Sequence, residues 1–437
     1  MYANQGFAVC VLDSPKAIFQ VQCRLFKAFK GENQMIVEPK IRGFICTTAH
    51  PQGCAKNIQN QVNFIKKHPL LTKGPKKVLV IGASTGYGLA SRIAAAFGAK
   101  ADTIGVFYER SAEGKRTASA GWYNTAAFEQ IAKEEGLYAK SVNGDAFSDD
   151  IKQQTIELIQ RDFGGKVDLV IYSLASPRRQ DPKTGEIYNS TLKPIGQAFT
   201  SKTVNVMTGE VSDISIEPAT QNDIEQTVKV MGGDDWKLWI EALLNANLLA
   251  PNAITLAYSY IGPKLTYPVY RHGTIGKAKE HLEQTAHELN TVLQNKIKGH
   301  AFVSINKALV TQASAAIPVV PLYISLLYKI MKERNIHEGC IEQIQRLFAK
   351  QLYSGNEIKT DEEGRIRIDD LEMRKDVQDE IVKLWQQVNT DNVEKISDLK
   401  GYRNDFYNLF GFNFEGVGYQ RDLDIDLAIP SITETVK

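Results

Sequence analysis

Residues 77–88 read KVLVIGASTGYG, in which the apolar run 78–81 leads directly into glycines at positions 82, 86 and 88. A run of this length predicts a buried strand, and the glycines permit a tight turn into a helix that begins near Leu89. N–H groups at the start of such a helix attract a pyrophosphate. The stretch therefore predicts the strand–turn–helix unit with which a parallel sheet binds a dinucleotide.

The same pattern of short β-branched runs and longer amphipathic segments continues along the chain. Further strands are predicted over residues 102–108, 137–142, 167–175, 253–261 and 300–306. Each spacer is long enough for a crossover helix, as parallel βαβ units require. The predicted fold class is therefore α/β, an enlarged Rossmann-like doubly wound parallel sheet.

Two regions depart from this alternation. Residues 178–235 are polar, with turn residues between alternating stretches, and we expect a hairpin-rich insertion that forms a substrate wall. Residues 307–437 are predicted to be mainly helical, with one hairpin around 360–368. Their most apolar stretch, 315–331, is short for a membrane span, contains two prolines and carries Lys329, which predicts a buried helix or pocket wall. We expect residues 35–437 to form one domain.

The composition excludes several classes of protein. The 437 residues include 52 basic and 50 acidic side chains, so the formal charge of +2 predicts no nucleic-acid partner. Five scattered cysteines without CxxC spacing indicate reduced thiols and no metal site. Residues 1–34 lack the apolar core and cleavage site of a signal peptide, and Met35 is a candidate start. We expect a cytoplasmic protein without stable membrane insertion.

Polar residues follow the predicted strands where a nucleotide would lie. Glu109 ends the second strand, and a carboxylate there accepts hydrogen bonds from ribose hydroxyls and repels a 2′-phosphate, which favours NADH over NADPH. Arg110 is an opposing signal, because a guanidinium could bind that phosphate. Asp145 and Ala146 follow the third strand, and Leu174 and Ala175 follow the fourth. For Glu109 and Asp145 the alternatives are a solvated strand end and a helix cap.

Residues 257–279 contain several candidates for the acid and cation that hydride transfer requires. Tyr260 and Lys264 have a common reductase spacing, but the intervening Pro263 disfavours a shared helix. Tyr270 precedes a long predicted helix that carries Lys277 and Lys279. Spacing alone leaves the choice between these two lysines open.

Six motifs in order resemble the long single-chain enoyl reductases, the FabV-type enoyl-acyl-carrier-protein reductases and the related trans-2-enoyl-CoA reductases. The motifs are GASTGYG (82–88), VFYER (106–110), YSLASPRR (172–179), AYSYIGP (257–263), VYRHGTIGKAK (269–279) and LVTQASAAIP (309–318). The resemblance runs from Met35 to the C-terminus and leaves residues 1–34 outside it as an N-terminal extension.

The resemblance implies roles for individual residues. The Tyr-x8-Lys motif of the family matches Tyr270 as the catalytic proton donor and Lys279 as the cation beside the cofactor. Tyr260 is implied as a substrate contact, and Tyr87 as a catalytic-site aromatic beside the donor, with packing of the glycine turn as its alternative. The implied NADH contacts are Gly82, Ala83, Ser84, Thr85, Gly86, Tyr87, Tyr108, Glu109, Asp145, Ala146, Leu174, Ala175, Lys279, Leu309, Val310 and Thr311.

The implied activity is reduction by NADH of the trans-2 double bond of an enoyl thioester on acyl carrier protein or coenzyme A, the final reductive step of fatty acid elongation. A hydride would reach the β-carbon while Tyr270 stabilises the enolate oxygen. The alternatives are a short-chain-type NAD(P)H-dependent reductase of ketoacyl carbonyls and a protein that senses NADH without turnover. We expect a monomer, because the insertion and the C-terminal region can cover faces that a smaller reductase buries in a tetramer.

Overall fold

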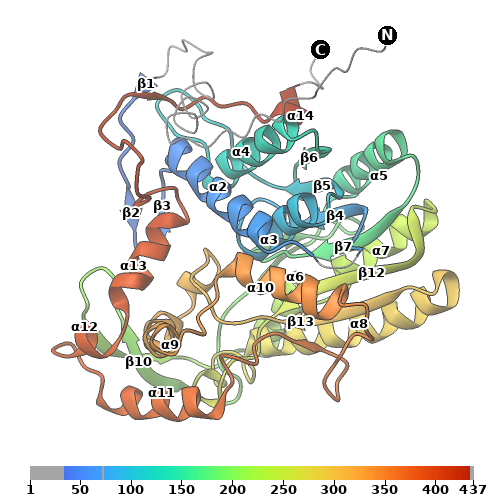
Figure 1. Ribbon diagram of the computed structural model, residues 1–437. Coiled ribbons are helices and arrows are strands. Elements are labelled where there is room, and N and C mark those ends of the chain that lie inside the picture. The colour runs from blue at the N-terminus through green and yellow to red at the C-terminus, as the bar shows by residue number, and fades with distance from the viewer. Residues whose placement is uncertain (1–33, 71–72, 434–437) are drawn as a thin grey trace, which may run out of the picture.

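The computed structural model describes residues 34–70 and 73–433, and the predictions made for residues 1–33 lie outside this range. Its centre is a seven-stranded parallel sheet with the order β14-β13-β12-β7-β4-β5-β6 (Figure 1). The strands are β4 (Lys77–Ile81), β5 (Asp102–Phe107), β6 (Ala139–Asn143), β7 (Val167–Tyr172), β12 (Leu249–Ser259), β13 (His300–Ile305) and β14 (Ile366–Arg367). The predicted doubly wound fold is confirmed.

Helices cover both faces of the sheet, which is why its strands are continuously apolar. In β4, Val78 and Val80 pack into one hydrophobic cluster, whereas Leu79 and Ile81 pack into another. The first face carries α2 (Pro51–Lys67), α3 (Gly86–Ile93), α4 (Ala120–Glu134) and α10 (Cys340–Leu347), and the second carries α5 (Asp149–Phe163), α7 (Asp234–Asn245) and α8 (Thr274–Ile297). Helix α3 begins three residues earlier than the predicted Leu89, and α2 is a helix that the sequence analysis did not predict.

The chain changes direction across the sheet between β4 and β7. From β4 it proceeds outward through β5 and β6, and from β7 it proceeds the other way through β12, β13 and β14. The connections that follow β4 and β7 therefore leave in opposite directions. This creates the crevice, outside the carboxyl ends of the strands, in which doubly wound sheets bind ligands.

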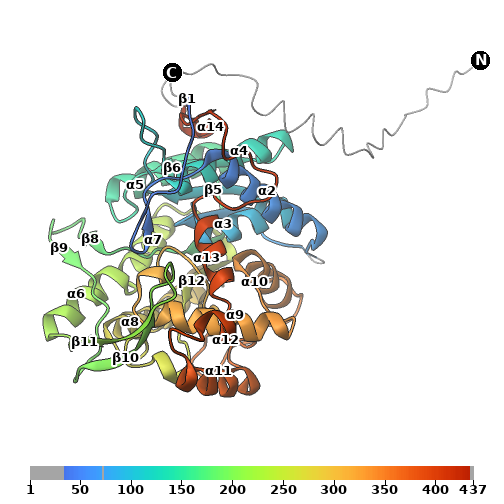
Figure 2. The same cartoon turned by 90° about the vertical axis from the view of Figure 1, so that its left-hand side faces the viewer.

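The insertion contains the two hairpins that the sequence predicted and one helix that it did not. Strands β8 (Arg178–Gln180) and β9 (Ile187–Asn189) form the first hairpin, and β10 (Phe199–Val204) and β11 (Val211–Ile216) form the second. They lie together with α6 (Gln221–Met231) on one side of the molecule (Figure 2). A capping box between Thr220 and Asp223 starts α6 and was a readable signal.

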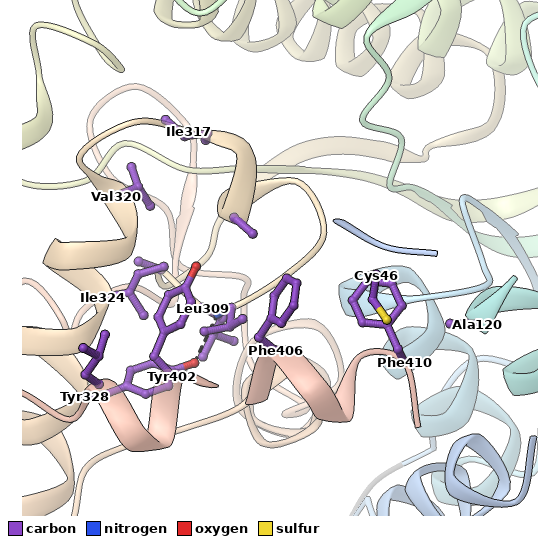
Figure 3. Close-up of a cluster of buried hydrophobic side chains, with 14 of the residues drawn as sticks. Cys46, Ala120, Leu309, Ile317, Val320, Ile324, Tyr328, Tyr402, Phe406 and Phe410 are labelled. Atoms are coloured by element: carbon purple, nitrogen blue, oxygen red, sulfur yellow. Dashed lines mark hydrogen bonds between the residues drawn. The ribbon is translucent and has the colours of Figure 1, made fainter. Parts of the chain in front are cut away.

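The C-terminal region is mainly helical, as predicted, and surrounds a buried helix. Helix α9 (Val320–Glu333) takes up most of the apolar stretch 315–331, which confirms the prediction of a buried helix. In α13 (Leu399–Asn408), Tyr402 lies beside Tyr328 of α9, and Phe406 lies beside Leu309 in the same apolar cluster (Figure 3). The remaining helices are α11 (Lys375–Gln387), α12 (Val393–Ile396) and α14 (Pro430–Thr433). Over the described part of the chain, no helix is long and apolar enough to cross a membrane.

The hairpin predicted around residues 360–368 is wrong. Asp361 accepts hydrogen bonds from the backbone N–H and the guanidinium of Arg365, both at 2.9 Å, which closes a turn. The residues after this turn pair in parallel with β13 as strand β14, because the sheet edge buries Ile366 completely. Short antiparallel pairs complete the fold, namely β1 (Gln34–Met35) with β15 (Leu423–Asp424) and β2 (Ile41–Arg42) with β3 (Ile45–Cys46).

Candidate active site

One large cavity of about 1040 Å³ opens at the carboxyl ends of the central strands. Its lining comes from the connections after β4, β5, β6, β7, β12 and β13, and from α2, α10 and α13. It lies at the change of direction between β4 and β7. Every residue that the sequence placed at the site lines this cavity except Ala83, which is fully buried and donates its N–H to the carbonyl of Val106.

The glycine loop is built for close backbone approach. Gly82 has a φ of +87°, and a Cβ atom there would lie 2.1 Å from the carbonyl oxygen of Ser173. A Cβ atom on Gly88 would lie 2.0 Å from the carbonyl oxygen of Gly82, so neither position accepts a side chain. Thr85 precedes α3 in an extended conformation and does not cap it with its side chain. The first N–H groups of α3 are thus left for an anionic ligand.

Glu109 is held by both neighbouring strands. The Ser84 hydroxyl donates to Oε1 of Glu109 at 2.7 Å, and the Glu109 backbone exchanges two hydrogen bonds with the Asn143 side chain at 2.8 and 3.0 Å. Tyr108 is 78% exposed and lies at the mouth of the cavity. Arg110 is exposed and lies outside the cavity lining, which argues against binding of a 2′-phosphate by its guanidinium.

The other predicted cofactor contacts are fixed by local hydrogen bonds. Asp145 lines the cavity and accepts the N–H of Phe147 at 3.0 Å in the loop before α5, whose cap is Ser148, so the helix-cap alternative for Asp145 is wrong. In the loop after β13, Val310 donates its N–H to the Tyr328 hydroxyl at 3.1 Å. The carbonyl of Leu309 accepts from the Ser314 hydroxyl at 2.6 Å. Leu174, Ala175 and Thr311 complete this part of the lining.

The structure places the two lysines of α8 in different surroundings. Lys279 is 8% exposed and lines the cavity, whereas Lys277 is exposed and pairs with Glu280 at 2.8 Å. Tyr270, in the turn before α8, is 7% exposed and lines the same cavity. Burial raises the pKa of Tyr270 and lowers that of Lys279 to about 8. A protonated tyrosine and a lysine thus face one cavity.

Tyr260 and Lys264 do not form the common reductase pair. The strand β12 ends before Tyr260, and Pro263 precedes a single 3₁₀ turn that leaves Lys264 exposed. The Tyr260 ring meets the Tyr270 ring edge to face, with centroids 4.9 Å apart. Its hydroxyl donates to Glu372 at 2.9 Å. The structure therefore confirms that Pro263 keeps Tyr260 and Lys264 off a common helical face.

Tyr87 lines the cavity with its ring, but its hydroxyl points into the protein. The hydroxyl oxygen lies 2.9 Å from both the carbonyl of Lys307 and Oε1 of Gln343, two acceptors for its one proton. The ring packs 5.8 Å from that of Tyr258. The ring thus lies at the cavity, as the expected aromatic of the site would, while the hydroxyl is bonded inside the protein, as the packing alternative expects.

Several buried polar residues at the cavity were missed from the sequence. Three buried side-chain atoms that belong to cavity-lining residues have no hydrogen-bond partner among the described residues: Oδ1 of Asn124, Oγ of Ser259 and Nδ2 of Asn306. Lys307 is 2% exposed, and burial lowers its pKa to about 8. Ser259, Asn306 and Lys307 stand at the ends of β12 and β13, a position that could have identified them. Within residues 34–70 and 73–433, no cluster of three or more acidic, histidine or cysteine side chains could hold a metal.

Because the cavity joins a dinucleotide-binding loop to a buried tyrosine and a buried lysine, the chain falls in the class of Rossmann-type oxidoreductases with a nicotinamide cofactor. Family models narrow this class. Residues 36–114 match the NAD(P)H binding domain of trans-2-enoyl-CoA reductase, residues 116–353 match the trans-2-enoyl-CoA reductase catalytic region, and residues 360–423 match a model described as the enoyl reductase FAD binding domain. The chain belongs to the trans-2-enoyl-CoA reductase family.

Individual relatives agree with this assignment. The enoyl-[acyl-carrier-protein] reductase [NADH] of Coxiella burnetii is 68% identical over 401 residues, which cover 92% of this chain and 99% of the relative. The trans-2-enoyl-CoA reductase [NADH] of Ruminiclostridium cellulolyticum is 61% identical over 398 residues, or 91% of this chain and all of the relative. The crystal structure of Clostridium acetobutulicum trans-2-enoyl-CoA reductase with NADH matches with a TM-score of 0.87 and 49% identity, over 90% and 98% of the two chains.

Residues 360–423 do not fit the flavin that the description of their family model suggests. Their helices and strands bury apolar side chains against α9 and the sheet edge. They line the large cavity only through Asp405, Asn408, Leu409 and Phe414. A second cavity, lined in part by residues 360 and 363–365, has a volume of about 130 Å³, far too small for FAD. No step of the reaction below uses a flavin.

Proposed function

We propose that this chain reduces the trans-2 double bond of enoyl thioesters with NADH, as the final reductive step of fatty acid elongation. The observation that carries the proposal is the single cavity lined by the glycine loop, Glu109, Tyr270 and Lys279 in a chain of this family. The relatives named above are NADH-dependent reductases of enoyl thioesters on acyl carrier protein or coenzyme A. This kinship favours reduction of the alkene over reduction of a ketoacyl carbonyl.

NADH fits the residues that line the cavity. The uncapped start of α3 suits a pyrophosphate, and the Glu109 carboxylate suits the hydroxyls of the adenosine ribose. The same carboxylate repels a 2′-phosphate, which disfavours NADPH. The remaining contacts that we assign to NADH are Gly82, Ser84, Thr85, Gly86, Tyr87, Tyr108, Asp145, Ala146, Leu174, Ala175, Lys279, Leu309, Val310 and Thr311, with Ala83 supporting the loop from beneath.

The protein side chains supply the electrostatics of the reaction. The chemistry that NADH supplies when bound is a hydride for the β-carbon. Negative charge then develops on the thioester oxygen, and the Tyr270 hydroxyl donates a hydrogen bond to it, since burial keeps this tyrosine protonated. The Lys279 ammonium adds positive potential beside the oxygen, an effect of about 3 kcal/mol in comparable sites. Protonation of the α-carbon completes the saturated thioester. Tyr260 contacts the substrate with its ring.

We also propose that the enzyme acts as a cytoplasmic monomer, with residues 35–437 as one domain and no nucleic-acid partner. In support of a monomer, α6 packs on α8 and β10 packs on α9, so the insertion covers helices that a smaller reductase would bury against another subunit. Cys46, Cys54 and Cys340 are free thiols, which suits a reducing compartment. The near balance of basic and acidic residues gives no attraction to a polyanion.

Steady-state NADH oxidation by the purified chain tests the function. We expect oxidation with crotonyl-CoA or with a longer trans-2-enoyl group on acyl carrier protein, and none with a 3-ketoacyl thioester. The ratio of the two enoyl rates identifies the preferred carrier. Oxidation with the ketoacyl thioester alone would establish the carbonyl reductase instead, and tight NADH binding without any oxidation would establish the sensor.

A further inference from the structure

Glu372 lies between β14 and α11, far along the chain from the residues that the sequence placed at the site. Its side chain is fully buried. The hydroxyls of Tyr260 and Tyr323 donate to its Oε1 at 2.9 and 2.6 Å, and the N–H of Ala308 donates to its Oε2 at 2.7 Å. One carboxylate therefore joins the turn after β12, the loop after β13 and helix α9.

All three segments contribute residues to the cavity lining, α9 through Tyr328, and two of them lie where we assign the substrate and the cofactor. Tyr260 lines the cavity and packs edge to face on the ring of Tyr270. Ala308 immediately precedes residues 309–311, all of which line the cavity. A movement of Glu372 would consequently shift both the neighbour of the tyrosine acid and the loop that we assign to the cofactor.

The surroundings of Glu372 satisfy a carboxylate. Burial raises the pKa of Glu372, and the positive charge of the equally buried Lys307 opposes this shift. Gln378 donates to the backbone carbonyl of Glu372 at 2.7 Å and to the Tyr323 hydroxyl at 3.1 Å, which fixes the group from behind. The Tyr260 hydroxyl donates to Glu372, so its proton is directed at this side chain and away from the substrate.

We propose that Glu372 is a positioning residue for the reduction, which holds the Tyr260 ring against Tyr270 and fixes the loop of residues 309–311. Its kinetic consequences rest on the proposed function, because they require turnover of an enoyl thioester. Residues 360–423 would thus support the active site through Glu372, a role that requires no flavin.

A double-mutant cycle tests whether Glu372 acts through Tyr260. Glu372→Gln places an amide N–H₂ where only acceptors fit, and we expect kcat/KM for the enoyl thioester to fall by about 10- to 100-fold. Tyr260→Phe removes one donor, with an expected fall of about 3- to 10-fold. In the double variant, Tyr260→Phe adds less than about a further twofold loss. Losses that multiply would overturn the proposal.

Direct NADH binding, measured by fluorescence, separates this proposal from the proposed function. Glu372→Gln loosens Ala308 and should raise the Kd for NADH severalfold, whereas Tyr260→Phe should leave it within about twofold. Equal Kd values for NADH in both variants would contradict the proposal that Glu372 fixes the loop of residues 309–311. The Kd for NADH can be measured without turnover. It therefore tests the role of Glu372 even if the parent enzyme does not reduce enoyl thioesters, a result that would contradict only the proposed function.

Glu129→Gln is the matched control for a generic loss of stability. Glu129 is also a buried carboxylate, accepts the N–H and the hydroxyl of Ser431, both at 2.9 Å, and lies outside the cavity lining. We expect Glu129→Gln to lower the melting temperature and leave kcat/KM within about twofold. An equal loss of kcat/KM in Glu129→Gln and Glu372→Gln would contradict a specific role of Glu372.

If Glu372→Gln does not fold, Tyr323→Phe replaces it in the cycle. Tyr323 lies outside the cavity lining and donates to the same carboxylate oxygen as Tyr260. We expect its loss of kcat/KM to combine with that of Tyr260→Phe less than multiplicatively, because both act through Glu372. Full multiplication of the two losses would overturn the proposal.

Discussion

The guanidinium of Arg271 lies 3.0 Å from Oε1 of Glu283, and this ion pair ties the turn that carries Tyr270 to the helix that carries Lys279. Glu283 follows Lys279 by one turn of α8, so both project from the same face of the helix. Arg365 approaches the same carboxylate at 3.3 Å. Arg271 and Arg365 together neutralise the charge of Glu283. We therefore expect the Arg271–Glu283 ion pair to act mainly by holding Tyr270 and Lys279 in a fixed relative position.

Loss of this ion pair should therefore slow turnover. We expect Arg271→Ala to lower kcat about tenfold with a smaller change in KM, because a small displacement of the tyrosine costs reactivity more than binding. Arg271→Lys should restore only part of kcat, since an ammonium cannot replace a two-point contact. Lys237→Ala removes an exposed ion pair with Glu288, which also lies on α8, and should leave kcat within about twofold. Equal kcat values for Arg271→Ala and Lys237→Ala would refute the geometric role.

The two lysines of α8 make a matched pair for the assignment of the cation. We expect Lys279→Ala to lower kcat/KM by at least about 100-fold, because it removes the positive charge that faces the cavity. Lys277→Ala removes an exposed lysine two residues earlier on the same helix and should change kcat/KM by less than about twofold. Steady-state kinetics with an enoyl thioester distinguish them. A large loss in Lys277→Ala alone would reverse the assignment.

The lowered pKa of Lys279 predicts a pH dependence. The charged form is the active one, and in the free enzyme burial lowers its pKa to about 8. The kcat/KM for NADH should thus be maximal below about pH 8 and fall as the pH rises through this value. Lys279→Arg should remove this alkaline limb, since a guanidinium stays charged. If the limb persists unchanged in Lys279→Arg, the buried Lys307, whose pKa is also lowered to about 8, would be the titrating group.

Glu109 should set the preference between the two nicotinamide cofactors. Glu109→Ala removes the carboxylate that repels a 2′-phosphate, and we expect the ratio of kcat/KM for NADPH to that for NADH to rise by at least about tenfold. Glu113→Ala, on the same loop but exposed and paired with Arg116, is the control and should leave the ratio unchanged. A strong NADPH preference of the parent enzyme would contradict the role of Glu109.

The sequence predicts the sheet well where the physical signal is local. The apolar β-branched runs mark the six longer strands, and residues 82–88 mark the crossover at which the cavity opens. Helix α2 was missed because His50 is a less common cap, although Pro51 at the first position of the helix is a typical start signal. The two-residue strand β14 exists only because β13 offers it an edge.

The site divides in the same way. Tyr270 and Lys279 stand in one motif, but burial was needed to separate Lys279 from Lys277. Glu372 and Tyr260 are 112 positions apart in the sequence, so only tertiary packing brings the carboxylate to Tyr260. The ring of Tyr87 lines the cavity as expected, while the direction of its hydroxyl depends on acceptors from the loop after β13 and from α10.

The most direct test follows deuterium from NADH labelled at the nicotinamide C4 position into the product of a trans-2-enoyl thioester. In ordinary water, each label stereoisomer is used in turn and the product is examined by mass spectrometry and NMR. The proposed reaction predicts deuterium at the β-carbon from one stereoisomer, and a solvent proton at the α-carbon. The absence of deuterium at the β-carbon of the saturated product with both stereoisomers would contradict it.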